Sequence, residues 1–257
     1  MHILVTNDDG VDAAGLLALV QALQPDHDLT IVAPNRNWSA SGHVKTMHRP
    51  LRVKETRLAD GTVGFSTDGA PSDCVALALL GLIETPIDLV VSGINPNANL
   101  GHDVTYSGTV TAAMEAAING VPGMAVSLDG PSMRSDPMDY TAAAAIASEL
   151  VGRLNGRKLR NDMVLNVNVP YGSRDEIMGA RLTRQGLRVY RDELVRRLDP
   201  KNRPYYWIGG EAPSGIAEPG TDFWALSQKL VSITPLKLDM THDDDLGQLA
   251  GWDLNLD

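Results

Sequence analysis

The chain has a single cysteine, Cys74, among its 257 residues and no apolar run long enough to cross a bilayer. One cysteine cannot form an intramolecular disulfide, the bond that many secreted proteins use. The longest apolar stretch, residues 74–83, falls well short of the roughly 20 residues that a membrane-spanning helix needs. The first residues form a strand-like pattern, without the basic segment and apolar core of a signal peptide. We therefore expect a cytoplasmic protein that binds no membrane, with Cys74 as a small core residue.

Basic residues are also scarce. The chain has 22 lysines and arginines against 32 aspartates and glutamates, which gives a formal net charge of -10. Such a charge opposes a broad electrostatic contact with a polyanion such as duplex DNA. The composition predicts no stable nucleic-acid binding, and it requires a local positive centre for any ligand that carries phosphate.

Several well-known motifs are missing. The sequence contains no G-x-x-x-x-G-K-[ST] loop for triphosphates and no G-x-G-x-x-G after its first strand-like segment. It also lacks the G-x-S-x-G turn of many serine hydrolases. The 6 histidines show no ligand spacing, and one cysteine is too few for a closed zinc site. These absences disfavour nucleoside triphosphatases, dinucleotide enzymes, acyl-transfer hydrolases and structural zinc proteins.

Short β-branched runs alternate with helical patterns over residues 1–170, which is typical of a parallel sheet covered by helices. Strands are predicted at residues 2–6, 29–33, 88–92, 124–128 and 164–169. Helices are predicted at residues 14–24, 72–83, 107–120 and 140–154. The pattern predicts an α/β fold with a doubly wound, mostly parallel, Rossmann-like sheet, in one domain that spans residues 1–257.

Two regions break this alternation. Residues 44–67 read as strands around the Asp60-Gly61 turn, and they predict an antiparallel addition to the sheet. Residues 180–213 are charged and aromatic without a helical period, and they predict a projecting C-terminal arm. Such an arm either packs on a partner subunit, as an oligomerisation element, or forms a plain hairpin on its own domain. One further strand is predicted at residues 231–236.

Two adjacent carboxylates, Asp8 and Asp9, follow the first predicted strand. Neighbouring side chains of a strand point to opposite faces, so this pair can reach one ligand only if the chain turns there. Asn7 and Gly10 flank the pair, and both residue types tolerate tight turns. Capping of the next helix is the simpler explanation, but one aspartate suffices for a cap. Two carboxylates together therefore suggest a bound cation that relieves their repulsion.

Two later loops, residues 33–43 and 93–109, are rich in asparagine, serine and glycine. The second is long for a connection between a strand and a helix, and long loops in compact domains are usually functional. It offers Asn95, Asn97 and Asn99 as neutral oxygen donors. Two carboxylates, one hydroxyl and one amide oxygen would form a set of four oxygen ligands. Such a set suits Mg²⁺ or Mn²⁺ better than zinc.

The second loop leads directly into a predicted helix through Ser107, Gly108 and Thr109. Free backbone N–H groups and the helix dipole attract an anion at such an N-terminus, although Ser107 or Thr109 could instead only cap its own helix. A metal beside an anion site would polarise a phosphoryl group and lower the pKa of a bound water. We therefore predict a phosphate-ester hydrolase in which Asp8 and Asp9 are catalytic and Asp9 orients or deprotonates the water. His43 is a minor candidate for a general acid.

With these segments in view, the chain resembles the SurE family of stationary-phase survival proteins. The resemblance covers almost the whole chain and is carried by "ILVTNDDG" at 3–10, "APNRNWSASGH" at 33–43, "DGAPSDCV" at 68–75, "VVSGINPNANLGHDVTYSGTVTAAMEAA" at 90–117, "LNVNVP" at 165–170, and "TDFWAL" with "VSITPL" near the end. The block from 90 to 117 is the most specific of these segments. Two positions depart from the usual family pattern, Asn35 in place of an aspartate and Asn97 in place of a glycine.

The resemblance implies a metal-dependent 5'/3'-nucleotidase that hydrolyses nucleoside monophosphates. It implies one divalent cation, Mg²⁺ or Mn²⁺, in each subunit, held by Asp8, Asp9, Ser39 and Asn95. It also implies a homodimer or homotetramer built by exchanged C-terminal arms. The alternative from another class is a signalling module that binds metal and phosphate without turnover, although receiver domains of that kind are much shorter than this chain.

Overall fold

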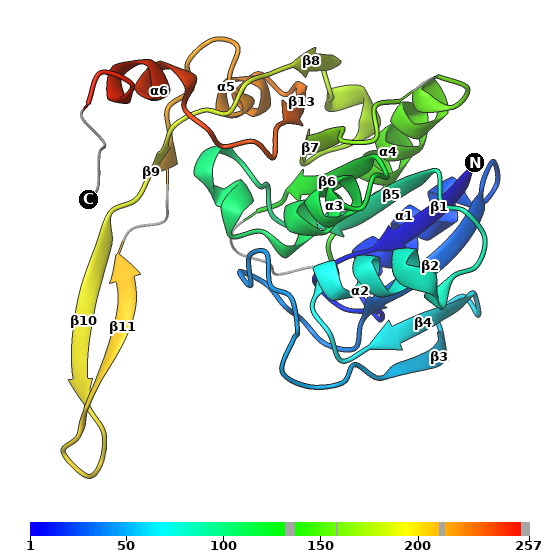
Figure 1. The fold of residues 1–257 in the computed structure, drawn as a ribbon, viewed down its shortest axis with the longest axis horizontal. Helices are drawn as coiled ribbons and strands as arrows, with labels where there is room; N and C mark the ends of the chain where they lie inside the picture. The colour runs from blue at the N-terminus through cyan, green and yellow to red at the C-terminus, as the bar shows by residue number, and fades with distance from the viewer. Residues whose placement is uncertain (132–136, 158, 211–213, 253–257) are drawn as a thin grey trace.

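The computed structural model describes residues 1–131, 137–157, 159–210 and 214–252, and Figure 1 shows its fold. Its centre is a nine-stranded sheet in the order β3-β4-β2-β1-β5-β6-β7-β13-β8. Most neighbours in this sheet are parallel, whereas β3 runs antiparallel to β4 and β13 runs antiparallel to β7. The nine strands are β1 (His2–Thr6), β2 (Asp28–Pro34), β3 (Val53–Arg57), β4 (Val63–Thr67), β5 (Leu89–Asn95), β6 (Gly123–Asp129), β7 (Val164–Pro170), β8 (Ala180–Leu182) and β13 (Val231–Leu236).

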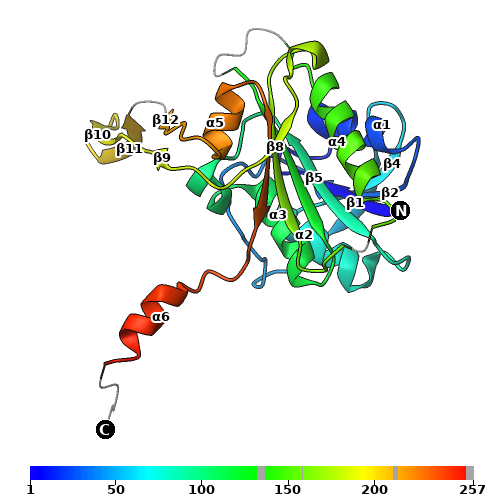
Figure 2. The ribbon, with the colours of Figure 1, turned by 90° about the horizontal axis from the view of Figure 1, so that it is seen from above.

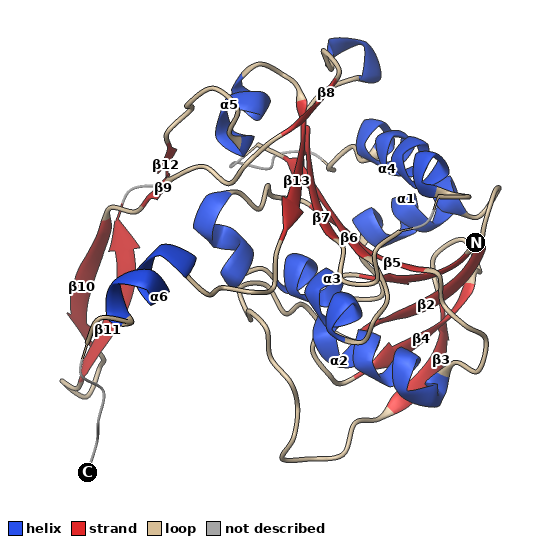
Figure 3. Cartoon of the chain, turned by 45° about the horizontal axis from the view of Figure 1, so that its top comes forward, coloured by secondary structure: helices blue, strands red, loops and turns tan. Residues whose placement is uncertain are grey.

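Helices cover both faces of the sheet, as expected for a doubly wound fold (Figure 3). One face carries α1 (Ala14–Leu23) and α4 (Thr141–Leu154), and the other carries α2 (Pro71–Leu77) and α3 (Gly108–Ile118). Strand β1 has β2 on one side and β5 on the other, so the winding direction reverses at β1. Open α/β sheets bind ligands at the carboxyl end of such a switch point, which here is the position of Asp8 and Asp9.

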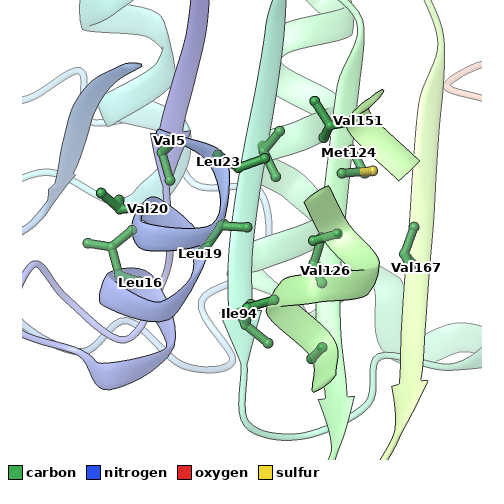
Figure 4. Packing of buried hydrophobic residues seen from close by; sticks show 14 of the residues in the cluster. Val5, Leu16, Leu19, Val20, Leu23, Ile94, Met124, Val126, Val151 and Val167 are labelled. Carbon is green, nitrogen blue, oxygen red and sulfur yellow. The ribbon is translucent and has the colours of Figure 1, made fainter. Parts of the chain in front are cut away.

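Alternation along β1 explains how the sheet buries both faces. Ile3 and Val5 belong to the apolar cluster under α1 and α4, whereas Leu4 belongs to the cluster under α2 and α3. Figure 4 shows the first cluster, in which Leu16, Leu19, Val20 and Leu23 of α1 pack near the strands. The helix buries these residues because their spacing of three and four places them on one face. This packing fixes the position at which β1 ends.

The predicted fold class is confirmed, and every strand and helix predicted between residues 1 and 170 is present within a few residues. The antiparallel addition is present as β3 and β4 around the Asp60-Gly61 turn. The helix predicted at residues 72–83 ends as α2 at Leu77 and continues in a wider turn, Ala78–Leu82, with Gly81 at a φ of 123°. Cys74 is buried in the core, as expected, and its burial raises the pKa of its thiol.

The region predicted as an arm, residues 180–213, divides into several parts. Its first strand, β8, lies at the edge of the main sheet beside β13, so this part does not project. The projecting part is the antiparallel hairpin of β10 (Asp192–Leu198) and β11 (Pro204–Gly210), and residues 211–213 lie outside the described residues. At its base, β9 (Arg188–Val189) pairs with β12 (Ser214–Gly215).

Two helices in the C-terminal part were not predicted, α5 (Asp222–Ser227) and α6 (Asp243–Leu249). In Figure 2 the hairpin and α6 extend away from the sheet in different directions. Within the described part of the chain, no helix combines the length and apolar character that crossing a membrane requires.

Candidate active site

The chain turns sharply where β1 ends, as the sequence predicts. The side-chain amide of Asn7 donates to the Gly10 carbonyl at 2.9 Å, and the Gly10 N–H donates back to Asn7 Oδ1 at 3.2 Å. Gly10 adopts a φ of +109°, which favours glycine, and a Cβ there would lie 3.3 Å from the backbone of Arg36. Asp8 and Asp9 therefore sit in a closed turn between β1 and α1, where strand alternation no longer separates them.

Asp8 is 3% exposed and lies against the first turn of α3. Its Oδ1 accepts a hydrogen bond from the Thr109 hydroxyl at 2.7 Å, and its backbone carbonyl accepts from the Trp38 N–H at 2.7 Å. Burial raises the pKa of Asp8, although hydrogen bonds from Thr109 oppose this shift. Among the described residues, no basic side chain forms an ion pair with Asp8. A bound cation would supply the missing positive charge.

The N-terminus of α3 is shaped to receive Asp8. A Cβ on Gly108 would lie 2.7 Å from the Asp8 Cβ, so only glycine lets the helix approach this closely. Ser107 is the N-cap, because its hydroxyl accepts a hydrogen bond from the Val110 N–H at 3.1 Å. The capping role is therefore present for Ser107, while Thr109 holds Asp8. Whether this helix end also binds phosphate stays a prediction for Ser107, Gly108 and Thr109.

Asn37 connects Asp9 to the loop after β2, a role that the sequence did not predict. Its side-chain amide donates to Asp9 Oδ1 at 3.1 Å, and its Oδ1 accepts from the Ser39 N–H at 2.7 Å. One asparagine thus brings Ser39 toward the carboxylate pair. The Ser41 hydroxyl oxygen, in contrast, is buried with no partner in the described structure. The contact through Asn37 links the Ser39 backbone to Asp9, and the choice of Ser39 over Ser41 as a metal ligand stays a prediction.

The three asparagines after β5 separate into different roles. The Asn95 side-chain N–H donates to the Asn97 carbonyl at 2.6 Å, and its Oδ1 forms no hydrogen bond with the described residues. Asn99 is buried, and its amide donates to Ser127 Oγ at 2.8 Å while its backbone N–H donates to Asn168 Oδ1 at 2.8 Å. Asn99 therefore anchors the loop to the sheet, which leaves Asn95 as the better metal ligand of the two.

The candidate ligands follow β1, lie in the loop after β2 and end β5, and these three strands are neighbours in the sheet. Asn37 joins the loop after β2 to Asp9. A family model described as "Survival protein SurE" matches residues 3–192. The chain belongs to the SurE family. This finding confirms the resemblance seen in the sequence.

Close relatives cover nearly the whole chain. It is 52% identical over 251 residues to the "5'-nucleotidase SurE" of Herpetosiphon aurantiacus, with 97% of each chain covered. It is 47% identical to the protein of the same name from Chloroflexus aggregans, with 98% of this chain and 99% of the relative covered. The crystal structure of the SurE protein from Aquifex aeolicus superposes with a TM-score of 0.81 at 36% identity, covering 97% of this chain and 98% of that one.

This SurE chain also contains an ionic cluster around the buried Glu115 that the sequence did not reveal. Glu115 of α3 accepts hydrogen bonds from His43 Nε2 at 2.8 Å, from Lys45 Nζ at 3.1 Å and from the Asn119 side chain at 3.0 Å. Burial acts to raise the pKa of Glu115, but these hydrogen bonds outweigh it and the pKa is lowered. His43 is thereby tied to α3 and anchors the loop that carries Ser39, and a role for it as a general acid stays a prediction.

Proposed function

We propose that this SurE chain is a phosphomonoesterase that hydrolyses nucleoside 5'-monophosphates to nucleoside and phosphate, with 3'-monophosphates as a second substrate class. The observation that carries the proposal is the buried Asp8 carboxylate, held at a helix N-terminus with no ion pair to a basic side chain among the residues that the structure describes. The names of the relatives, "5'-nucleotidase SurE", support the choice of substrate.

The proposed cofactor is one divalent cation per subunit, Mg²⁺ or Mn²⁺, held by Asp8, Asp9, Ser39 and Asn95. These residues offer two carboxylates and two neutral oxygens, which fits a hard cation. Among the described residues there is no group of three or more histidine, cysteine, aspartate and glutamate side chains that could hold a metal. When bound, the cation would polarise the phosphoryl oxygens and lower the pKa of a water molecule.

The side chains of the site have separate tasks in this proposal. Asp9, which is only partly buried, accepts the proton of the attacking water. The first turn of α3, at Ser107, Gly108 and Thr109, orients the phosphate through the positive end of the helix dipole. Thr109 keeps Asp8 in place through its hydroxyl.

Phosphate release from nucleoside monophosphates tests this function. We expect the wild-type chain to require Mg²⁺ or Mn²⁺ and the Asp8→Asn variant to lose activity by about a thousandfold or more, because the ligand charge is gone. Asp12→Asn is the matched control, since Asp12 is an exposed aspartate in the same segment. Full activity in the presence of a chelator, or in Asp8→Asn, would contradict the proposal. A stable acyl-phosphate without phosphate release would instead favour the signalling module.

We also propose that the chain forms a homodimer or homotetramer through the β10–β11 hairpin. Trp207 is 63% exposed and Ile208 is 82% exposed, and adjacent strand residues face opposite sides. The hairpin therefore presents apolar side chains on both of its faces. Such exposure is typical of a surface that a partner covers.

A further inference from the structure

The loop that leads into α3, residues 99–107, is held by residues beside the hairpin. These residues, 185–190 together with Asp222, are called the base of the arm. The Asp222 carboxylate, 0% exposed at the start of α5, accepts the Gly101 N–H through Oδ2 at 2.8 Å and the Gly186 N–H through Oδ1 at 2.8 Å. The Gln185 side chain donates to the Gly101 carbonyl at 2.8 Å. Both backbone polar groups of Gly101 are thus bound by residues that lie more than eighty positions later in the chain.

A second contact follows two residues further along the same loop. Asp103 forms an ion pair with Arg188 Nε at 2.9 Å and accepts a hydrogen bond from the Tyr190 hydroxyl. The backbone carbonyl of Asp103 in turn accepts the N–H of Tyr106 at 3.0 Å and that of Ser107 at 3.1 Å. Ser107 is the N-cap of α3, the helix whose first turn holds Asp8. Asp103 therefore contacts Arg188 and Tyr190 through its side chain and the start of α3 through its backbone.

The other end of the loop is held independently. Asn99 is fixed by Ser127, Asn166 and Asn168, which belong to β6 and β7. Asn95 lies before this anchor, whereas Asp103 and Ser107 lie after it. Disturbing the arm contacts should therefore move the helix end and leave Asn95 in place.

We propose that Asp103 and Asp222 are positioning residues for phosphate binding, which makes the base of the arm a part of the active-site framework. Arg188 and Tyr190 lead directly into β10, so the hairpin and the phosphate end of the site share one hydrogen-bonded unit. This inference rests on the proposed function, because it assigns the α3 N-terminus to the phosphate of the substrate.

Asp103→Asn tests the inference, since this partly exposed residue can lose its ion pair without leaving a buried charge. We expect KM for the nucleotide and the inhibition constant for inorganic phosphate to rise about tenfold, with kcat and the calorimetric affinity for Mn²⁺ within about twofold of wild type. A purely structural defect would lower the active fraction, and hence kcat, without changing KM. Unchanged phosphate constants in Asp103→Asn would overturn the inference.

Hydrogen exchange provides a readout that does not depend on activity. In Asp222→Asn, and in the milder Gln185→Ala should the first variant not fold, we expect faster exchange at residues 101–107 and unchanged exchange at residues 95–99. Asp199→Asn is the control, because it removes an ion pair with Arg203 at 2.8 Å near the tip of the hairpin. An inactive wild-type chain would refute the proposed function alone, whereas unchanged exchange at residues 101–107 would refute the positioning role whatever the activity.

Discussion

The Asp8 carboxylate is buried in a position that favours its neutral form, because burial raises its pKa. A carboxyl group whose pKa is raised in the folded state stabilises the protein fully below its unfolded pKa, and this contribution is lost as the pH rises through the folded pKa. At neutral pH the ionised group therefore lowers the free energy of unfolding when no cation is bound. The aspartate on which the proposed metal site depends therefore destabilises the metal-free fold.

We predict that Asp8→Asn raises the melting temperature of the metal-free chain at pH 7.5 by about 2–4 °C, because it removes this buried charge. The difference should shrink as the pH falls toward the ordinary aspartate pKa of about 3.9. Thermal melts in chelator measure the effect, and added Mn²⁺ should stabilise the wild type but not the variant. A lower melting temperature for Asp8→Asn in chelator at pH 7.5 would show that its charge is compensated within the protein.

Local sequence rules predicted the turn at Asp8 and Asp9, because strand alternation and the turn preferences of Asn7 and Gly10 act within a few residues. The same rules could not separate Asn95 from Asn99, since the difference depends on side chains of β6 and β7. They also missed Glu115, whose partners His43 and Lys45 lie 72 and 70 positions away. A glutamate on a predicted helix is normally solvated, and only the packed structure shows that this one is buried.

Helix α3 serves two loops at once. Its first turn holds Asp8, while Glu115, further along the helix, binds the segment around His43. The lowered pKa of Glu115 means that its contribution to stability is present above the unfolded pKa and is lost as the pH falls. Helix α3 therefore links the turn at Asp8 to the loop around His43, and the second of these contacts depends on a carboxylate that becomes protonated in acid.

We predict that Glu115→Gln lowers the free energy of unfolding by about 1–2 kcal/mol at pH 7, because His43 and Lys45 lose a charged acceptor. The loss should diminish as the pH falls below the ordinary glutamate pKa of about 4.3 and through the lowered pKa of the folded state, because the wild-type carboxylate then also becomes protonated. Urea titrations across this range measure it. Exposed Glu84 provides the control variant Glu84→Gln, and a penalty that stays constant with pH would argue against the ionic origin.

Replacement of glycine by alanine should have opposite effects at two helical positions, Gly108 and Gly152. Gly108→Ala would place a Cβ 2.7 Å from the Asp8 Cβ, whereas a Cβ on Gly152 of α4 meets nothing within 4 Å. We expect Gly152→Ala to stabilise the chain by about 0.5–1 kcal/mol with unchanged activity. Gly108→Ala should reduce nucleotidase activity by about a hundredfold, because it displaces Asp8. Equal activities of the two variants in phosphate-release assays would contradict this reading of α3.

Sequence patterns predicted the elements of the first 170 residues because their periods are long enough to recognise. The C-terminal part was harder to predict, since α5 is short and β8 has only three residues. Their roles depend on distant partners: Asp222 contacts Gly101 across 121 positions. No local rule indicates which strand β8 joins.

At the scale of the whole molecule, the hairpin is almost uncovered by the chain's own residues, since every residue of β10 but Val195 is exposed. We predict that the double variant Trp207→Ser and Ile208→Ser lowers the molecular mass measured by light scattering, because it removes apolar surface from both faces. Lys201→Ser, at the exposed turn of the same hairpin, is the control. If the double variant kept the mass of the wild type, the hairpin would not be the assembly surface.

The place of β13 in the sheet has a consequence for the order of synthesis. Residues 231–236 lie between β7 and β8, although both of those strands precede them in the chain. While the protein emerges from the ribosome, β1 to β7 can assemble once β7 has been made, because every neighbour that β1 to β6 have in the sheet lies within this set. The edge of β7 then stays open, and β8 has no neighbour until Leu236 has emerged. A nascent chain that stalls before this point exposes a strand edge rich in valine, which is a template for aggregation.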